Sequence, residues 1–212
     1  MMDGTRRSFD LEAIRADFPI LSREVHGKPL VYLDSAASAQ KPAQVLDALM
    51  SAYQDTYANV HRGLHFLSEA STDLYEAVRG KVAGFIGAAS GDEIVLTSGA
   101  TMSLNLIARC WAQPRLQPGD EILISIAEHH ANIVPWQMVA EATGARVRAF
   151  TLEDDGAFSM ARLKAEMSEC TRIISVPHVS NVLGTVFPVA EIAELAHDAG
   201  ALMVVDGCQG VV

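Results

Sequence analysis

Residues 171–206 read TRIISVPHVSNVLGTVFPVAEIAELAHDAGALMVVD. Two runs rich in β-branched and other aliphatic residues, 172–177 and 201–205, enclose a helical pattern whose apolar positions recur every three to four residues from Val189. Gly200 can adopt the left-handed conformation that ends such a helix directly before the second run. Strands that are apolar on successive residues are typical of parallel sheets covered on both faces. The stretch therefore predicts a strand, a helix and a second, parallel strand.

The same alternation extends toward the N-terminus. Further β-branched runs occur at residues 93–97, 121–126 and 146–151. Helical patterns occupy residues 10–18, 42–53 and 67–85, and another begins near Met102. The helices at 42–53 and 67–85 each carry an apolar stripe that we expect to pack against other elements. The predicted fold class is α/β, with a mostly parallel sheet between two helical layers in three-layer α/β/α order.

Composition and charge exclude several classes of protein. The 212 residues are 50% hydrophobic, and 16 Lys and Arg against 26 Asp and Glu give a formal net charge of −10 without a basic stripe. We therefore expect no nucleic-acid partner. No apolar run reaches the length of a membrane span, and residues 1–17 carry no signal-peptide pattern, so we expect a cytoplasmic protein that binds no membrane. The three cysteines have no metal-binding spacing and suit free thiols.

Candidate functional residues follow the predicted strands, at the edge where ligands of open parallel sheets bind. Small residues at 98–101 precede a helix, and such a turn can admit a phosphate or simply cap the helix. His129 follows the run at 121–126, where an imidazole could stack on an aromatic cofactor and move protons. Asp206 ends an apolar strand, and it could either face a cation such as a protonated pyridine nitrogen or cap the next element.

Other chemistries are less well supported. His61 and His65 lie four residues apart and Glu128, His129 and His130 are consecutive, but no HExxH motif is present, so we predict no metal site. No GxGxxG follows a strand, which argues against dinucleotide binding, and no GxSxG indicates a serine hydrolase.

Five segments together carry a family resemblance. They are YLDSAASAQKP at 32–42, NVHRG at 59–63, EHHANIVPW at 128–136, VSNVLG at 179–184 and DGCQ at 206–209. In this order they resemble the pyridoxal-phosphate (PLP) enzymes of fold type I, aminotransferase class V, and more closely the Suf-type (group II) cysteine desulfurases and selenocysteine lyases. The resemblance implies the large domain of a PLP-dependent transferase, truncated to its N-terminal half. Residues 1–20 would be an N-terminal arm that packs with a missing small domain, and residues 21–212 an incomplete PLP-binding large domain.

The resemblance also implies roles for individual residues. Ala100 and Thr101 would hold the cofactor phosphate, and Asp206 would pair with the pyridine nitrogen and keep it protonated. His129 would stack on the ring and act as the catalytic acid and base. Asn181 and Gln209 would lie near the phenolic oxygen, and Asn181 would also face the substrate carboxylate. Ala36 and His61 would border the substrate pocket.

The implied activity is conversion of L-cysteine to L-alanine and an enzyme persulfide for iron–sulfur cluster assembly, by a homodimer that serves a sulfur-acceptor protein. L-selenocysteine stays open as a substrate. The family lysine that binds the cofactor covalently would follow Asp206, but the four lysines all precede it, at positions 28, 41, 81 and 164. None of the three cysteines matches the sulfur-accepting position, and Met102 stands where the family commonly has glutamate. We therefore expect the chain to be inactive alone.

Two other hypotheses remain open at this point. One is a non-catalytic interaction partner, such as one half of a split enzyme, and the other is a different class V PLP enzyme.

Overall fold

The computed structural model describes residues 9–211, and the first eight residues of the predicted arm lie outside this range. The chain divides into two compact units, which meet in sequence at Leu96 and Thr97. Each unit is described by itself.

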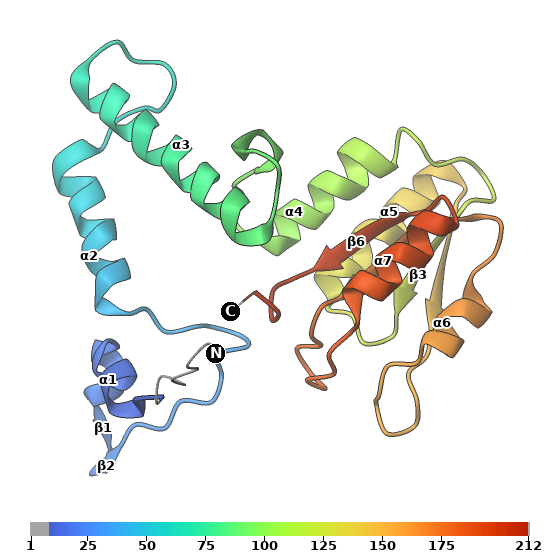
Figure 1. Ribbon diagram of the computed structural model, residues 1–212, viewed down its shortest axis with the longest axis horizontal. Coiled ribbons are helices and arrows are strands. Elements are labelled where there is room, and N and C mark those ends of the chain that lie inside the picture. Colours follow the sequence, from blue (N-terminus) through green and yellow to red (C-terminus); the bar gives the residue numbers. More distant parts are fainter. Residues whose placement is uncertain (1–8, 212) are drawn as a thin grey trace, which may run out of the picture. The chain divides into compact units, whose positions relative to one another are not determined.

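The C-terminal unit is built on a parallel sheet of four strands in the order β4-β3-β5-β6 (Figure 1). The strands are β3 (Glu121–Ser125), β4 (Arg146–Phe150), β5 (Thr171–Pro177) and β6 (Leu202–Asp206). Its helices are α4 (Ala100–Leu106), which continues as the π-helical segment η4 (Ile107–Ala112), α5 (Val134–Thr143), α6 (Met160–Glu166) and α7 (Val189–Asp198). The α/β class and the parallel sheet predicted from sequence are confirmed.

Two hydrophobic cores lie on opposite faces of this sheet. On β3, Ile122 and Ile124 pack into a cluster with side chains of α4, η4 and α5, whereas Leu123 packs into a second cluster with side chains of α6 and α7. Ile173 and Ile174 of β5 divide between the two clusters in the same way. Successive side chains of a strand point to opposite faces, so a strand covered on both faces must be apolar throughout. The unit therefore has the predicted three-layer α/β/α order.

One predicted strand is wrong. Residues 93–97 contain no strand: the 3-10 turn η3 (Gly91–Glu93) is followed by extended backbone at Ile94. Ile94 is buried, but Val95 is exposed. A strand requires a neighbour that completes its hydrogen bonds, and the ladders found in the described residues pair β3 to β6 only with one another.

The N-terminal unit is mainly helical. It contains α1 (Leu11–Ala16), the 3-10 turn η1 (Pro19–Ser22), α2 (Ala43–Ser51), the π-helical turn η2 (Ala52–Thr56) and α3 (Phe66–Ile86). A short hairpin joins β1 (Glu24–Val25) to β2 (Lys28–Pro29) through His26 and Gly27. Both of these residues have positive φ, which a two-residue hairpin turn of type I′ requires.

The apolar stripes of α2 and α3 differ from expectation. The helices form where predicted, but the stripe residues Leu49 and Leu74 are exposed, and Phe85 is 70% exposed. Within its unit α3 contacts chiefly the turns η2 and η3, and neither is large enough to cover a helix of 21 residues. Periodicity therefore predicted the helices correctly, but the packing of these faces is not seen in the part of the chain that is described.

None of the described helices combines the length and apolar character needed to cross a membrane.

Candidate functional site

The carboxyl ends of β3, β5 and β6 lie at one edge of the sheet, because the three strands are parallel neighbours. The backbone N–H of His178, directly after β5, donates to the Asp206 carbonyl at 2.8 Å. Ser180 Oγ donates to the Ala127 carbonyl at 3.4 Å and so connects the loop after β5 with the loop after β3. The fold thus brings the predicted residues around His129, Asn181 and Asp206 to a common edge.

Asp206 ends β6 with its side chain turned inward, and the residue is only 8% exposed. Its Oδ1 accepts from the Cys208 backbone N–H at 3.0 Å. Cys208 is an exposed residue, but partial desolvation of its thiol and a hydrogen bond to Asp206 raise the pKa of that thiol to about 11, so it stays protonated at neutral pH. No basic side chain forms an ion pair with Asp206 among residues 9–211. A buried carboxylate of this kind is costly unless a cation faces it.

His129 begins the short 3-10 turn η5 (His130–Asn132) that follows β3. Its Nδ1 accepts from the Ala131 backbone N–H at 3.1 Å, so in the neutral ring the proton is on Nε2. The ring is exposed and meets His130 edge to face at 6.2 Å between centroids. The backbone therefore sets both the orientation and the tautomer of this imidazole.

The start of α4 presents unpaired backbone donors. Gly99 has φ +150°, which side chains with a Cβ rarely adopt, and the Thr97 hydroxyl donates to its carbonyl at 3.1 Å. In the described structure the N–H groups of Ala100 and Thr101 have no hydrogen-bond partner, as is usual at the start of a helix. Helix α4 contacts η5, so these donors and His129 belong to packed neighbouring elements.

Two further predicted residues lie after strands β5 and β6. Asn181 is exposed in the loop after β5, and Gln209 is half-buried three positions after Asp206.

Two residues of this site were not predicted from the sequence. Asn132 was not a candidate, and Glu128 was considered only as a metal ligand. Burial and the nearby charge of Asp206 raise the pKa of Glu128 to about 8. Its Oε2 accepts from Asn132 Nδ2 at 2.8 Å, and the buried Asn132 accepts from Trp136 Nε1 and Ser175 Oγ at 2.8 and 2.7 Å. The spacing of 128, 132 and 136 is the signal that was available, since residues four apart share one face of a helical turn.

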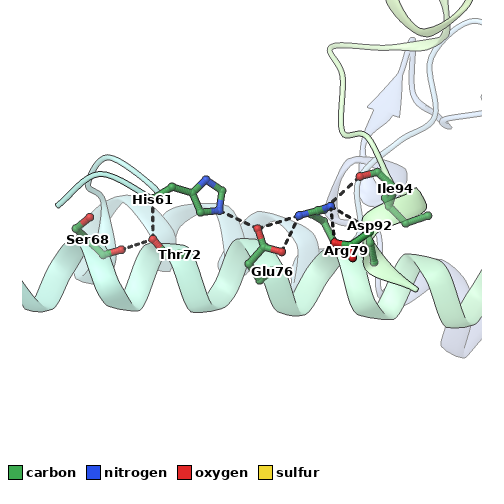
Figure 2. Close-up of polar contacts among 8 residues, drawn as sticks. His61, Ser68, Thr72, Glu76, Arg79, Asp92 and Ile94 are labelled. Atoms are coloured by element: carbon green, nitrogen blue, oxygen red, sulfur yellow. Dashed lines mark hydrogen bonds and ion pairs between the residues drawn. The ribbon is translucent and has the colours of Figure 1, made fainter. Parts of the chain in front are cut away.

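Ala36 and His61 belong to the N-terminal unit. Ala36 lies in an exposed turn whose neighbour Tyr32 donates from its hydroxyl to the carbonyl of Ser38 at 2.5 Å. His61 has φ +64°, and its backbone N–H donates to Thr72 Oγ1 at 2.9 Å. Figure 2 shows Ser68, Thr72 and Glu76 projecting from successive turns of α3 toward this loop. The loop at 59–63 is therefore held by one face of the helix.

Comparison with known proteins identifies the family. The aminotransferase class-V model matches residues 31–212. The chain belongs to the class V aminotransferase family. This is a family of pyridoxal-phosphate enzymes, and the resemblance stated from sequence is confirmed at this level.

The class V relatives include cysteine desulfurases. The chain is 52% identical over 204 residues to a cysteine desulfurase of Enterobacter sp. (strain 638), covering 96% of this chain and 50% of that protein. The crystal structure of the cysteine desulfurase CsdA from Escherichia coli matches with a TM-score of 0.84 at 43% identity, over 96% of this chain and 50% of that one. A C-DES variant with glycine covalently linked to its PLP cofactor matches with a TM-score of 0.77 over 92% of this chain and 50% of that one; at 21% identity it shows likeness of fold alone. The chain spans about half the length of these relatives.

The C-terminal unit also has a cavity at the opposite edge of its sheet. This cavity of about 340 Å³ is lined by Trp111, Arg115, Asp120 and Arg172, near the amino ends of the strands. Arg115 stacks over Trp111 at 4.9 Å, and Arg172 pairs with Asp120 at 3.1 Å. Both cations are thus already engaged, and the cavity lies away from His129 and Asp206. No cluster of three or more potential metal ligands was found within residues 9–211.

Proposed function

We propose that this chain carries the cofactor-binding site of a pyridoxal-phosphate-dependent cysteine desulfurase of the Suf type. The observation that carries this proposal is the buried Asp206 carboxylate, which has no cationic partner in the described chain. It ends β6, which only β5 separates from β3, the strand that the turn of His129 follows. A protonated pyridine nitrogen supplies the missing positive charge. The residues present therefore fit the cofactor.

Each proposed contact follows from a local feature. The unpaired N–H groups of Ala100 and Thr101 at the positive end of α4 would bind the phosphate. Asp206 would hold the ring nitrogen in its protonated form, and Asn181 and Gln209 would lie near the phenolic oxygen.

Chemistry at the site would divide between the cofactor and the protein. When bound, the cofactor supplies an electron sink for the negative charge that develops on the substrate α-carbon. His129, whose Nε2 is available for proton transfer, would stack on the ring and act as acid and base. Ala36 and His61 would border the substrate pocket, and Asn181 would also face the substrate carboxylate.

The wider function follows from the resemblance. The substrate would be L-cysteine, with selenocysteine as a second candidate, and the products L-alanine and a persulfide for iron–sulfur cluster assembly. The enzyme would act as a cytoplasmic homodimer with a sulfur-acceptor protein. A persulfide requires a thiolate, and the raised pKa of Cys208 argues against this cysteine as the sulfur carrier. The 212 residues would therefore bind the cofactor without turnover.

A second candidate, a non-catalytic interaction partner, is favoured by the exposed apolar faces of α2 and α3. A different class V PLP enzyme is the third candidate, since the chain belongs to the class V family as a whole.

Absorbance tests the proposal. The purified chain is mixed with pyridoxal phosphate, and its spectrum is recorded before and after borohydride and gel filtration. We expect saturable binding that gel filtration reverses and borohydride does not make permanent. Failure to bind, a chromophore trapped on one of the four lysines, or sulfide release from cysteine at an enzymatic rate would overturn the proposal.

A further inference from the structure

Glu128 places one carboxylate oxygen in a position that the proposed function does not use. Its Oε2 accepts from Asn132 Nδ2 at 2.8 Å. Its Oε1 is buried and has no hydrogen-bond partner anywhere in residues 9–211. An unpaired buried carboxylate oxygen is costly, and a carboxyl group lowers this cost by keeping its proton, because the neutral group is less costly to bury than the charged one.

The surrounding network decides where that proton is. The indole nitrogen of Trp136 can only donate, and it donates to Asn132 Oδ1 together with the hydroxyl of Ser175. The amide oxygen of Asn132 is therefore occupied, and its NH₂ group must face Glu128. Because Oε2 receives this hydrogen bond, a proton on Glu128 belongs on Oε1.

Asp206 is the charged group that acts on Glu128 from a neighbouring element. Burial is the largest cause of the raised pKa of Glu128, and it outweighs the hydrogen bonds to Asn132 and to the backbone of Ser125, which lower this pKa. The negative charge of Asp206 raises the pKa further. The other ionisable side chains at this edge are His129 and His130 of the same loop, His178 after β5, and Cys208, whose thiol contacts Asp206. Two ionised carboxylates here would repel each other without a cation between them.

We propose that Glu128 is a positioning residue for the cofactor: in the chain without cofactor Glu128 stays neutral beside Asp206, so that Asp206 is the ionised carboxylate that faces the ring nitrogen. This inference rests on the proposed function. The proton on Oε1 exchanges with water, so no other reactant is needed. A cation paired with Asp206 offsets the repulsion, so cofactor binding should make Glu128 release its proton more readily. By linkage, the chain with ionised Glu128 then binds the cofactor more tightly than the chain with neutral Glu128.

Carbon-13 NMR of the side-chain carboxyl groups tests the interaction between Glu128 and Asp206 in the 212-residue chain without cofactor. The Glu128 signal is assigned by its loss in Glu128→Gln. We expect it to titrate with a midpoint near pH 8, and Asp206→Asn to lower this midpoint by about one pH unit by removing the like charge. Asp198→Asn, at the exposed end of α7, is the matched control and should not shift it. A midpoint near that of an ordinary glutamate, or one that Asp206→Asn leaves unchanged, would overturn the inference.

Pyridoxal phosphate then tests the link to the cofactor. At saturating concentration we expect it to lower the Glu128 midpoint. We also expect Glu128→Gln to change the pH dependence of the dissociation constant between pH 7 and pH 9, whereas Glu141→Gln on the exposed face of α5 should not. Binding with an unchanged midpoint and an unchanged pH dependence would refute the role of Glu128 alone. Absence of binding to the unsubstituted chain would refute the proposed function. The titration without cofactor would still report on the interaction between Glu128 and Asp206.

Discussion

His61 Nε2 lies 2.8 Å from Oε1 of Glu76, and the same carboxylate accepts two hydrogen bonds from Arg79, at 3.1 and 2.8 Å (Figure 2). Arg79 in turn donates to the carbonyls of Gly91 and Ile94. The hydrogen bond with His61, and after it those from Arg79, lower the pKa of Glu76, so this carboxylate stays ionised at neutral pH. A single face of α3 thus holds two loops of the N-terminal unit.

Thr72→Val tests this arrangement at the backbone of His61. The substitution keeps the side-chain shape but removes the oxygen that accepts from the His61 N–H. A hydrogen bond of about 1 kcal/mol corresponds to about fivefold faster amide exchange at His61. Hydrogen exchange measured by NMR gives this rate. Ala77→Val, at an exposed position of the same helix, is the control for helix propensity and should leave the rate unchanged.

Asn132→Ala tests the buried network. It leaves Trp136 Nε1 and Ser175 Oγ without partners in the protein interior, so we expect the free energy of unfolding to fall by about 3 kcal/mol. Urea unfolding in a Trp111→Phe background reports on Trp136 alone. Gln137→Ala, on the exposed face of α5, should change the free energy by less than about 0.5 kcal/mol. Equal effects of the two substitutions would contradict the network.

The raised pKa of Glu128 predicts that the free energy of unfolding depends on pH. Its pKa is raised in the folded state, so its stabilising contribution is present below the unfolded pKa of about 4.5 and is lost as pH rises through about 8. The free energy of unfolding of the unsubstituted chain should therefore fall relative to Glu128→Gln by a few kcal/mol between pH 5 and pH 9. Groups whose pKa is lowered, such as Glu121, affect the stability of both proteins equally. Their contributions therefore cancel in the difference between the two free energies of unfolding. A constant difference across this range would show that the carboxyl is not held neutral.

Gly99→Ala tests the phosphate-binding turn. The added Cβ meets no atom within 4 Å, but φ +150° is strained for alanine by about 1–2 kcal/mol, so the turn should shift and misplace the N–H groups of Ala100 and Thr101. We expect about tenfold weaker binding of pyridoxal phosphate in an absorbance titration. Gly80→Ala in α3 also meets no atom within 4 Å and should leave the affinity unchanged.

Much of the fold could be predicted because burial on both faces leaves a local signature. The runs at 121–126, 146–151, 172–177 and 201–205 correspond to β3, β4, β5 and β6 within one residue at each end. The run at 93–97 has the same signature, but a strand also needs a partner, and partners are not encoded locally. The apolar stripes of α2 and α3 indicated helices correctly, because their periodicity is also local in the sequence. They could not show which segment covers them.

For the candidate site, the sequence could indicate the position of some side chains, whereas the roles of these residues stay predictions. An aspartate at the end of an apolar strand must be largely buried, and Asp206 is. The four-residue spacing of Glu128, Asn132 and Trp136 indicates a shared face but does not tell whether that face is buried, so the burial of the Glu128 carboxyl could not be predicted. Its environment depends on Asn132, Ser175 and Asp206, which the packing of three different segments brings together.

The most direct measurement is an NMR titration of the nitrogen-15-labelled chain with pyridoxal phosphate. The account predicts saturable shifts centred on the backbone N–H groups of Ala100, Thr101, His129 and Asp206, with Asp206→Asn weakening the binding. Shifts centred instead on Arg115 and Arg172, at the opposite edge of the sheet, or unchanged affinity in Asp206→Asn, would contradict it.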